Sequence, residues 1–185
     1  MIADDGRTPV LMDLGSLSPS PTPITSRSLA LTVQDIAAEH STMPYRAPEL
    51  FDVKTGSVVD TKVDIWSFGC TLYACLVGKS PFEARSEETG GSLSICVLSG
   101  DWRFPDDGAN KGKARQGAPN GHVDAGSRGD PISLPKKPGA ISENVREVVR
   151  ACLQVEPADR PDVDQLIVML EKCIAQLPDD SDHES

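Results

Sequence analysis

The sequence predicts a mainly α-helical domain, and three segments carry that prediction. Residues Lys62 to Val77 are apolar almost all round and Gly78 follows them, so this helix belongs in the middle of a core. Ser142 can cap a second helix and Asp162 a third, the latter with Gln165 at its third position. The apolar residues along these last two helices are Val145, Val148, Val149, Cys152 and Leu153, then Val163, Leu166, Ile167, Leu170, Ile174 and Leu177.

The first forty residues give weaker signals. Thr8–Met12 is a short apolar run between turn residues, which predicts a brief strand with Asp13 at its end. Residues 16–28 contain three Ser-Pro or Thr-Pro pairs, at Ser18, Ser20 and Thr22, and this composition predicts a mobile loop. The three hydroxyls are also candidate phosphoacceptors. A weakly helical or extended segment is expected over 29–39.

A polar stretch separates the central helix from the last two. Residues 106–139 are rich in Gly, Pro, Lys, Arg, Asn and Asp and have almost no large apolar side chain. Too little apolar surface is available there to offset the entropy of ordering the chain. We therefore expect a disordered insertion.

Composition restricts the function classes. The 185 residues are 38% hydrophobic, enough for one domain core, and the net charge of −10 excludes a protein that mainly binds nucleic acid. Five cysteines without a C-x-x-C pair indicate reduced thiols. With no apolar run of about 20 residues, no signal peptide and no lipidation motif, we expect an intracellular, cytoplasmic chain without its own membrane anchor.

Three motifs follow one another in a recognisable order. They are Asp13-Leu14-Gly15, Thr42-Met43-Pro44-Tyr45-Arg46-Ala47-Pro48-Glu49, and Asp64-Ile65-Trp66-Ser67-Phe68-Gly69, with Arg160-Pro161 near the end. Together they resemble the C-terminal helical lobe of the protein-kinase (α+β) fold, with the N-terminal lobe absent. Each motif alone is weak, and their order and spacing make the match specific.

A closer resemblance is to the Numb-associated kinases, in the myristoylated and palmitoylated serine/threonine kinase branch. It is carried by the runs at 9–16 (PVLMDLGS), 31–35 (LTVQD) and 45–51 (YRAPELF). The resemblance implies a metal loop ending at 15, an activation segment over 16–49 and central helices over 50–105. The last two helices then occupy 140–178 and an acidic tail 179–185. It also implies association with Golgi-type membranes.

The resemblance assigns chemistry to a few side chains. Asp13 would hold the Mg²⁺ that bridges the phosphates of ATP, although Asp-Leu-Gly alone also suits a tight turn. Thr42 would orient the catalytic aspartate and favour Ser or Thr in protein substrates over Tyr. With Met43, Pro44 and Tyr45 it would shape the pocket for the residue after the phosphoacceptor, the alternative being a simple Ser/Thr turn.

Other residues of these motifs receive structural roles. Glu49 and Arg160 would form a buried ion pair that ties the activation segment to the helices. Asp64 would accept backbone hydrogen bonds from the catalytic loop, or simply stabilise the start of its helix. Trp66, Phe68, Cys70 and Cys75 are expected in the core.

A working kinase also needs a Gly-rich loop, a lysine paired with a glutamate, and an H-R-D catalytic loop. Twelve residues before Asp13 are too few to supply them, so we expect a partial serine/threonine kinase domain that is inactive alone. Two alternatives stay open. One is a noncatalytic kinase-like module that binds a partner protein, and the other is an unrelated helical adaptor.

Overall fold

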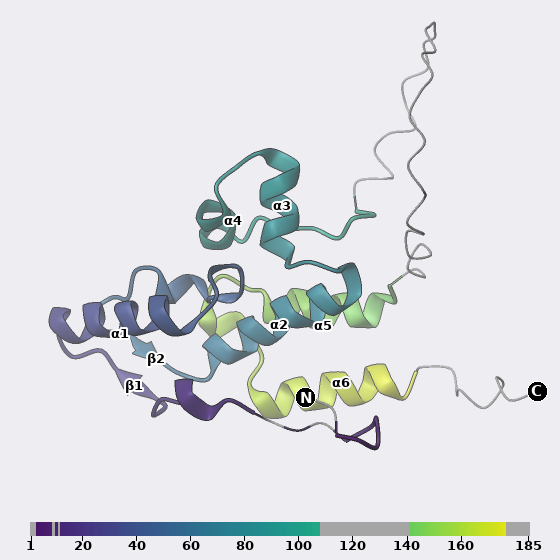
Figure 1. Ribbon diagram of the computed structural model, residues 1–185, viewed down its shortest axis with the longest axis horizontal. Helices are drawn as coiled ribbons and strands as arrows, with labels where there is room; N and C mark the ends of the chain where they lie inside the picture. Colours follow the sequence, from purple (N-terminus) through teal and green to yellow (C-terminus); the bar gives the residue numbers. More distant parts are fainter. Residues whose placement is uncertain (1–2, 9, 11, 108–140, 177–185) are drawn as a thin grey trace, which may run out of the picture.

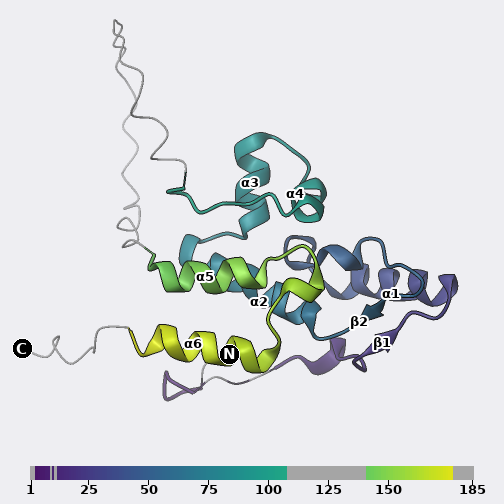
Figure 2. The same cartoon turned by 180° about the vertical axis from the view of Figure 1, so that it is seen from behind.

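The computed structural model describes residues 3–8, 10, 12–107 and 141–176, and these are mainly helical, as predicted. The helix α2 runs through the centre of the molecule beside α5 (Figure 1). Helices α3 and α4 lie on one side of this pair and α6 on the other, while α1 lies at the end of the molecule near the two short strands (Figures 1 and 2). The α-helices and strands in chain order are β1 (Thr22–Pro23), α1 (Arg27–His40), β2 (Val58–Val59), α2 (Lys62–Val77), α3 (Pro81–Thr89), α4 (Leu93–Ser99), α5 (Glu143–Cys152) and α6 (Val163–Ile174).

The central helix α2 has the bounds that the sequence predicts. It buries Trp66 and Tyr73 completely, and Gly78 ends it with a φ of 95°, a conformation that glycine adopts without steric cost. Phe82 stacks on Trp66 with 5.3 Å between ring centroids. One expectation was wrong, because Cys75 is exposed. A helix that is apolar all round does not reveal which of its residues lies outside the contacts with its neighbours.

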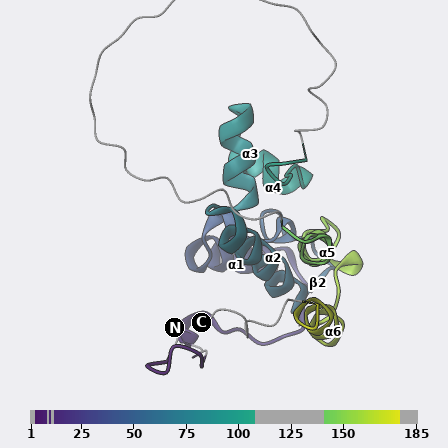
Figure 3. The ribbon, with the colours of Figure 1, turned by 90° about the vertical axis from the view of Figure 1, so that its right-hand side faces the viewer.

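Close packing between α2 and α5 depends on a glycine. A Cβ atom added to Gly69 would lie 2.6 Å from the Cβ of Cys152 and 3.0 Å from Leu153 Cδ2. The absence of a side chain therefore lets the two helices approach, and Val148 and Val149 of α5 are fully buried at this interface. The end-on view shows α2, α5 and α6 as neighbouring rods (Figure 3).

The last two helices begin at the residues predicted for them. Asp162 and Gln165 form a reciprocal capping box at the start of α6. Ser142 occupies the N-cap position of α5, but its side chain makes no capping hydrogen bond. The apolar stripe of α6 is only partly covered, since Leu166 is buried whereas Ile167 is 47% exposed and Ile174 66% exposed.

The segment expected as a loop over 16–28 contains regular structure. Leu14–Ser16 form a 3-10 turn, and β1 pairs antiparallel with β2 through Thr22 and Val59. Ser26 caps α1, which includes residues 29–39, so the segment expected to be weakly helical or extended is helical. The loop expectation missed β1 and this cap because a strand of two residues and a single N-cap leave little signal beside three Ser-Pro or Thr-Pro pairs.

The strand predicted over 8–12 is not formed by Thr8, Val10 or Met12, and residues 9 and 11 lie outside the described part. Asp5 instead accepts backbone hydrogen bonds from Arg7 and Thr8, which closes a turn.

The helices α3 and α4 were not predicted individually, because each is short and Gly90-Gly91 separates them. Ser80 and Glu83 form a capping box that begins α3. The expected insertion over 106–139 lies outside the described residues from 108 onward, as does the acidic tail over 179–185. In the described ranges, no helix is both long and apolar enough to cross a membrane.

Candidate functional site

Asp13 lies in the left-handed backbone region, with φ 60° and ψ 67°, at the start of the Leu14–Ser16 turn. Among the described residues it is the only non-glycine residue with positive φ, a region where Asp and Asn occur more often than most side chains. Its carboxylate is exposed, and so is Leu14 next to it. The local backbone therefore presents the carboxylate to solvent.

A carboxylate oxygen is a ligand that Mg²⁺ prefers, so Asp13 has the chemistry expected of it. Within residues 3–8, 10, 12–107 and 141–176, no group of three or more His, Cys, Asp or Glu side chains is arranged to hold a metal ion. Asp13 could supply one ligand, and the phosphate oxygens of a nucleotide and water would have to supply others.

The segment expected to receive the substrate is seated on the core. Met43–Tyr45 form a 3-10 turn that contacts α2, α3 and α4. Pro44 is buried, and Ser67 of α2 donates a 3.0 Å hydrogen bond to the carbonyl of Tyr45. Burial raises the pKa of the Tyr45 hydroxyl, with a further contribution from Glu83. The outer side of this turn, with Thr42 and Met43, remains exposed.

Arg46 joins this turn to α1, a role that motif reading did not reveal. Its guanidinium is buried and donates to the carbonyls of Ala38 and Ser41 at the end of α1, at 3.2 and 3.0 Å. Its Nε donates to the Ser41 hydroxyl, and its charge lies 5.1 Å from the ring centroid of Phe51. A cation near helix-terminal carbonyls is stabilising. The signal in the sequence that could have indicated this role is an arginine placed between Tyr45 and Ala47-Pro48, within a motif that is otherwise largely apolar.

Glu49 and Arg160, 111 residues apart in the chain, form a two-pronged ion pair. Arg160 Nη1 and Nη2 donate to the two carboxylate oxygens of Glu49 at 2.7 and 2.8 Å. The remaining N–H groups of Arg160 donate to the carbonyls of Gln154, Lys62 and Val155. All five donors of the guanidinium are thus satisfied, which the burial of this charge requires.

The ion pair also reaches the centre of the core. The guanidinium of Arg160 lies 4.9 Å from the ring centroid of Trp66, on the central helix. Its side chain is fully buried, whereas that of Glu49 is 21% exposed. The arginine therefore connects the Ala47–Leu50 region, the start of α2 and the loop before α6.

Asp64 lies in the first turn of α2 and faces a cavity of about 390 Å³. Although Asp64 is exposed, the walls of this cavity remove enough water to raise the pKa of its carboxyl. The other lining residues are Ser16, Leu17, Ser18, Pro19, Ser20, Thr22, Val33, Ile36, Val59, Asp60, Thr61 and Val63. Asp13 and Thr42 do not line it, so the structure does not bring the expected site residues into one pocket.

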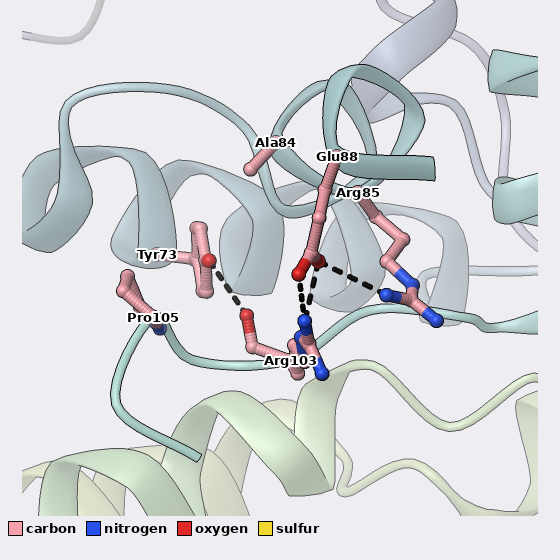
Figure 4. Close-up of a pocket in the computed structure, with 6 residues that line it drawn as sticks. All are labelled: Tyr73, Ala84, Arg85, Glu88, Arg103 and Pro105. Carbon is pink, nitrogen blue, oxygen red and sulfur yellow. Dashed lines mark hydrogen bonds and ion pairs between the residues drawn. The ribbon is translucent and has the colours of Figure 1, made fainter. Parts of the chain in front are cut away.

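A second cavity, of about 260 Å³, lies between α3 and the segment after α4 (Figure 4). Glu88 accepts from Arg85 and Arg103 at 3.0 Å, and Arg85 also donates to Asp101 at 2.9 Å. The Tyr73 hydroxyl donates to the backbone carbonyl of Arg103. The charged groups here balance one another, and none of the expected site residues lines this cavity.

We compared the sequence of the chain with models of known protein families. A family model described as protein kinase domain matches residues 25–169. The chain belongs to the protein kinase domain family. This match includes Ala47-Pro48-Glu49, the central helix and Arg160, the elements that the ion pair connects.

Three relatives carry serine/threonine kinase names. The chain is 37% identical over 176 residues to serine/threonine-protein kinase ppk13 of Schizosaccharomyces pombe, covering 95% of this chain and 42% of that protein. It is 31% identical over 171 residues to serine/threonine-protein kinase ENV7 of Saccharomyces cerevisiae, and the alignment covers 92% of this chain and 38% of that protein. It is also 31% identical over 171 residues to human serine/threonine-protein kinase 16, and this alignment covers 92% of this chain and 45% of that protein. The chain therefore spans less than half the length of these relatives.

Proposed function

We propose that this chain forms the C-terminal helical lobe of a serine/threonine protein kinase, in which it presents a Mg²⁺ ligand and the protein-substrate pocket. The observation that carries the proposal is the pairing of Glu49 with Arg160 inside the matched kinase region. This pair fixes the Ala47-Pro48-Glu49 motif on α2, so that Thr42, Met43, Pro44 and Tyr45 sit on a rigid base. Positioning of this kind lowers the barrier to phosphoryl transfer.

In this proposal, MgATP is the cofactor, and the metal neutralises charge that develops on the transferred phosphoryl group. Asp13 is the residue of this chain that would hold the metal. Thr42 would orient the general base, which with the Gly-rich loop and the lysine comes from sequence beyond these 185 residues. The exposed carboxylate of Asp13 leaves room for such partners.

In this proposal Asp64 holds the catalytic loop against the helices. Its cavity has carboxylates on one wall and apolar side chains of α1, Val33 and Ile36, on another. A catalytic loop seated there would donate backbone N–H groups to Asp64, since a partly desolvated carboxylate is stabilised by such donors. The runs at 9–16, 31–35 and 45–51 support placing the chain in the myristoylated and palmitoylated branch of the Numb-associated kinases.

A chimera tests the proposal. The matched region of Schizosaccharomyces pombe ppk13 is replaced by this chain, and phosphate transfer from MgATP to matched Ser, Thr and Tyr peptides is measured. We expect transfer to Ser and Thr, and a loss of roughly 100-fold or more for Asp13→Asn, because the metal stabilises charge in the transition state.

Asp4→Asn is the matched control, since Asp4 is another exposed carboxylate of the same segment, and it should leave the rate unchanged. An Asp13→Asn chimera as active as the unsubstituted chimera would contradict the metal role. A folded chimera without transfer that still retains a protein partner would favour the noncatalytic binding module.

A further inference from the structure

The three Ser-Pro and Thr-Pro pairs of the 16–28 segment differ in how accessible their hydroxyls are. Ser18 and Ser20 are exposed, and within the described part of the chain their hydroxyls have no hydrogen-bond partner. Thr22 is half-buried in β1, and its hydroxyl donates a 2.7 Å hydrogen bond to the carbonyl of Pro19. An enzyme that modifies hydroxyls followed by proline would therefore reach two of these three.

Ser18 and Ser20 also line the same cavity as two carboxylates. These are Asp64, in the first turn of α2, and Asp60, just before that helix, and no lysine or arginine is among the residues that line the cavity. The Asp60 carboxylate accepts a hydrogen bond from the backbone N–H of Lys62, which holds it in place. The Lys62 ammonium is engaged elsewhere, at the carbonyl of Arg160. A negative charge added at Ser18 or Ser20 would thus meet like charge.

We propose that Ser18 and Ser20 are modification sites for a proline-directed protein kinase, and that their phosphates drive residues 16–20 away from the Asp60 and Asp64 wall. In the transfer, the serine oxygen bonds to the γ-phosphorus of ATP, the bond from that phosphorus to the β-phosphate oxygen breaks, and ADP leaves. The hydroxyl proton passes to the base of the modifying kinase.

The direction of the effect follows from charge. Each phosphoserine carries about −1.5 to −2 charges at neutral pH and needs basic groups to order a segment. In this cavity a phosphate on Ser18 or Ser20 meets the carboxylates of Asp60 and Asp64, so it pushes residues 16–20 away from them and does not order the segment. Here this chain is the substrate, so the inference does not rest on its own proposed activity.

The first experiment maps the sites. The purified chain is incubated with MgATP and a proline-directed kinase that phosphorylates a synthetic peptide of residues 12–26, and sites are assigned by mass spectrometry. We expect phosphate at Ser18 and Ser20 and little at Thr22, with none over 16–21 in the Ser18→Ala/Ser20→Ala variant. Phosphorylation of the peptide without modification of Ser18 or Ser20 in the chain would overturn the proposal, as would equal modification of Thr22.

The second experiment measures the movement of residues 16–20 away from Asp60 and Asp64. Thermolysin cleavage before Leu17, an exposed leucine within the segment, is followed with and without phosphate. We expect roughly 5-fold faster cleavage after phosphorylation, the size given by a few like-charge pairs across water. The Asp60→Asn/Asp64→Asn variant removes the opposing charges and should lose this acceleration. An unchanged rate in the phosphorylated chain, or the same acceleration in the double variant, would overturn the charge mechanism.

Discussion

The region around Arg160 and the region around Asp13 differ in how they are held. Arg160 is 2% exposed and uses every N–H group of its guanidinium. Asp13 is exposed, and the 3-10 turn that follows it has no buried residue. The first region belongs to a packed core, whereas the second rests on a short turn. The fold therefore packs the Arg160 region tightly and leaves the expected metal ligand, Asp13, on an exposed turn.

This difference separates the packing of the chain from the metal chemistry proposed for it. The core is built by residues such as Trp66, Phe82 and Val149, which pack against one another. In the proposed function, the carboxylate of Asp13 acts together with groups from another segment. Substitutions in the two regions should therefore separate stability from chemistry.

Replacing Arg160 by alanine should have the largest effect on stability. It removes five hydrogen bonds and leaves the partly buried Glu49 carboxylate unpaired, so the free energy of unfolding should fall by about 3–5 kcal/mol. Urea denaturation followed by circular dichroism measures this change.

A matched control is Arg150→Ala, since Arg150 pairs with Glu143 at the surface, where an ion pair contributes less than about 1 kcal/mol. Equal unfolding midpoints for the Arg160→Ala variant and the unsubstituted chain would contradict the claim that the Arg160 region is the more stable of the two.

The fall in the free energy of unfolding at alkaline pH should depend on the ionisation of Tyr73. Burial raises the pKa of this phenol from 10.0 to about 12, so the unfolded chain releases the proton before the folded chain does. The associated stability is complete below pH 10 and is lost as the pH rises toward 12, by up to about 2–3 kcal/mol.

Tyr73→Phe is the test of this assignment. It removes the hydrogen bond to the Arg103 carbonyl, which should cost about 1 kcal/mol at neutral pH. The difference between the two proteins should shrink above pH 10 and then reverse in sign toward pH 12, because phenylalanine does not ionise. Parallel curves up to pH 12 would show that Tyr73 is not the responsible group.

Gly69→Ala should destabilise the core by a smaller amount. The added methyl group would overlap Cys152, at a cost of about 1–3 kcal/mol, offset by up to about 1 kcal/mol of helix propensity. Thr71→Ala, at an exposed site of the same helix, is the control. An alanine variant more stable than the parent would show that α2 and α5 pack less closely at this point.

Asp13→Ala should have the smallest effect. Exposed substitutions away from packed features change stability by no more than about 0.5 kcal/mol. Alanine enters the left-handed region less readily than aspartate, but the exposed turn relaxes when residue 13 leaves that region. The urea midpoint checks this. A loss comparable to that of Arg160→Ala would mean that the Asp13 region belongs to the core.

Sequence patterns predicted most of the core helices but few of the contacts around the candidate site. Both bounds of α2 were predictable, because Gly78 marks its end. For α6 only the start was predictable, because Asp162 and Gln165 form a capping box. The exposure of Cys75 and of Ile167 was not, since a helix pattern does not reveal how much of its apolar surface a neighbour covers.

Long-range polar contacts were predictable only through family resemblance. The pairing of Glu49 with Arg160 was expected on that ground, while the contacts of Arg46 and Arg146 were missed. Arg146 is buried, and its guanidinium pairs with Asp106 and Asp107 across 40 and 39 residues, a separation that no local pattern encodes.

Native-state hydrogen exchange of the 185-residue chain tests most directly the claim that the packed core and the expected metal ligand, Asp13, lie in regions of different stability. We expect amides of α2 from Ile65 to Tyr73 to exchange only through global unfolding, and amides of residues 14–18 to exchange through local opening at a free-energy cost well below that of global unfolding. Equal protection of the two segments would contradict the account.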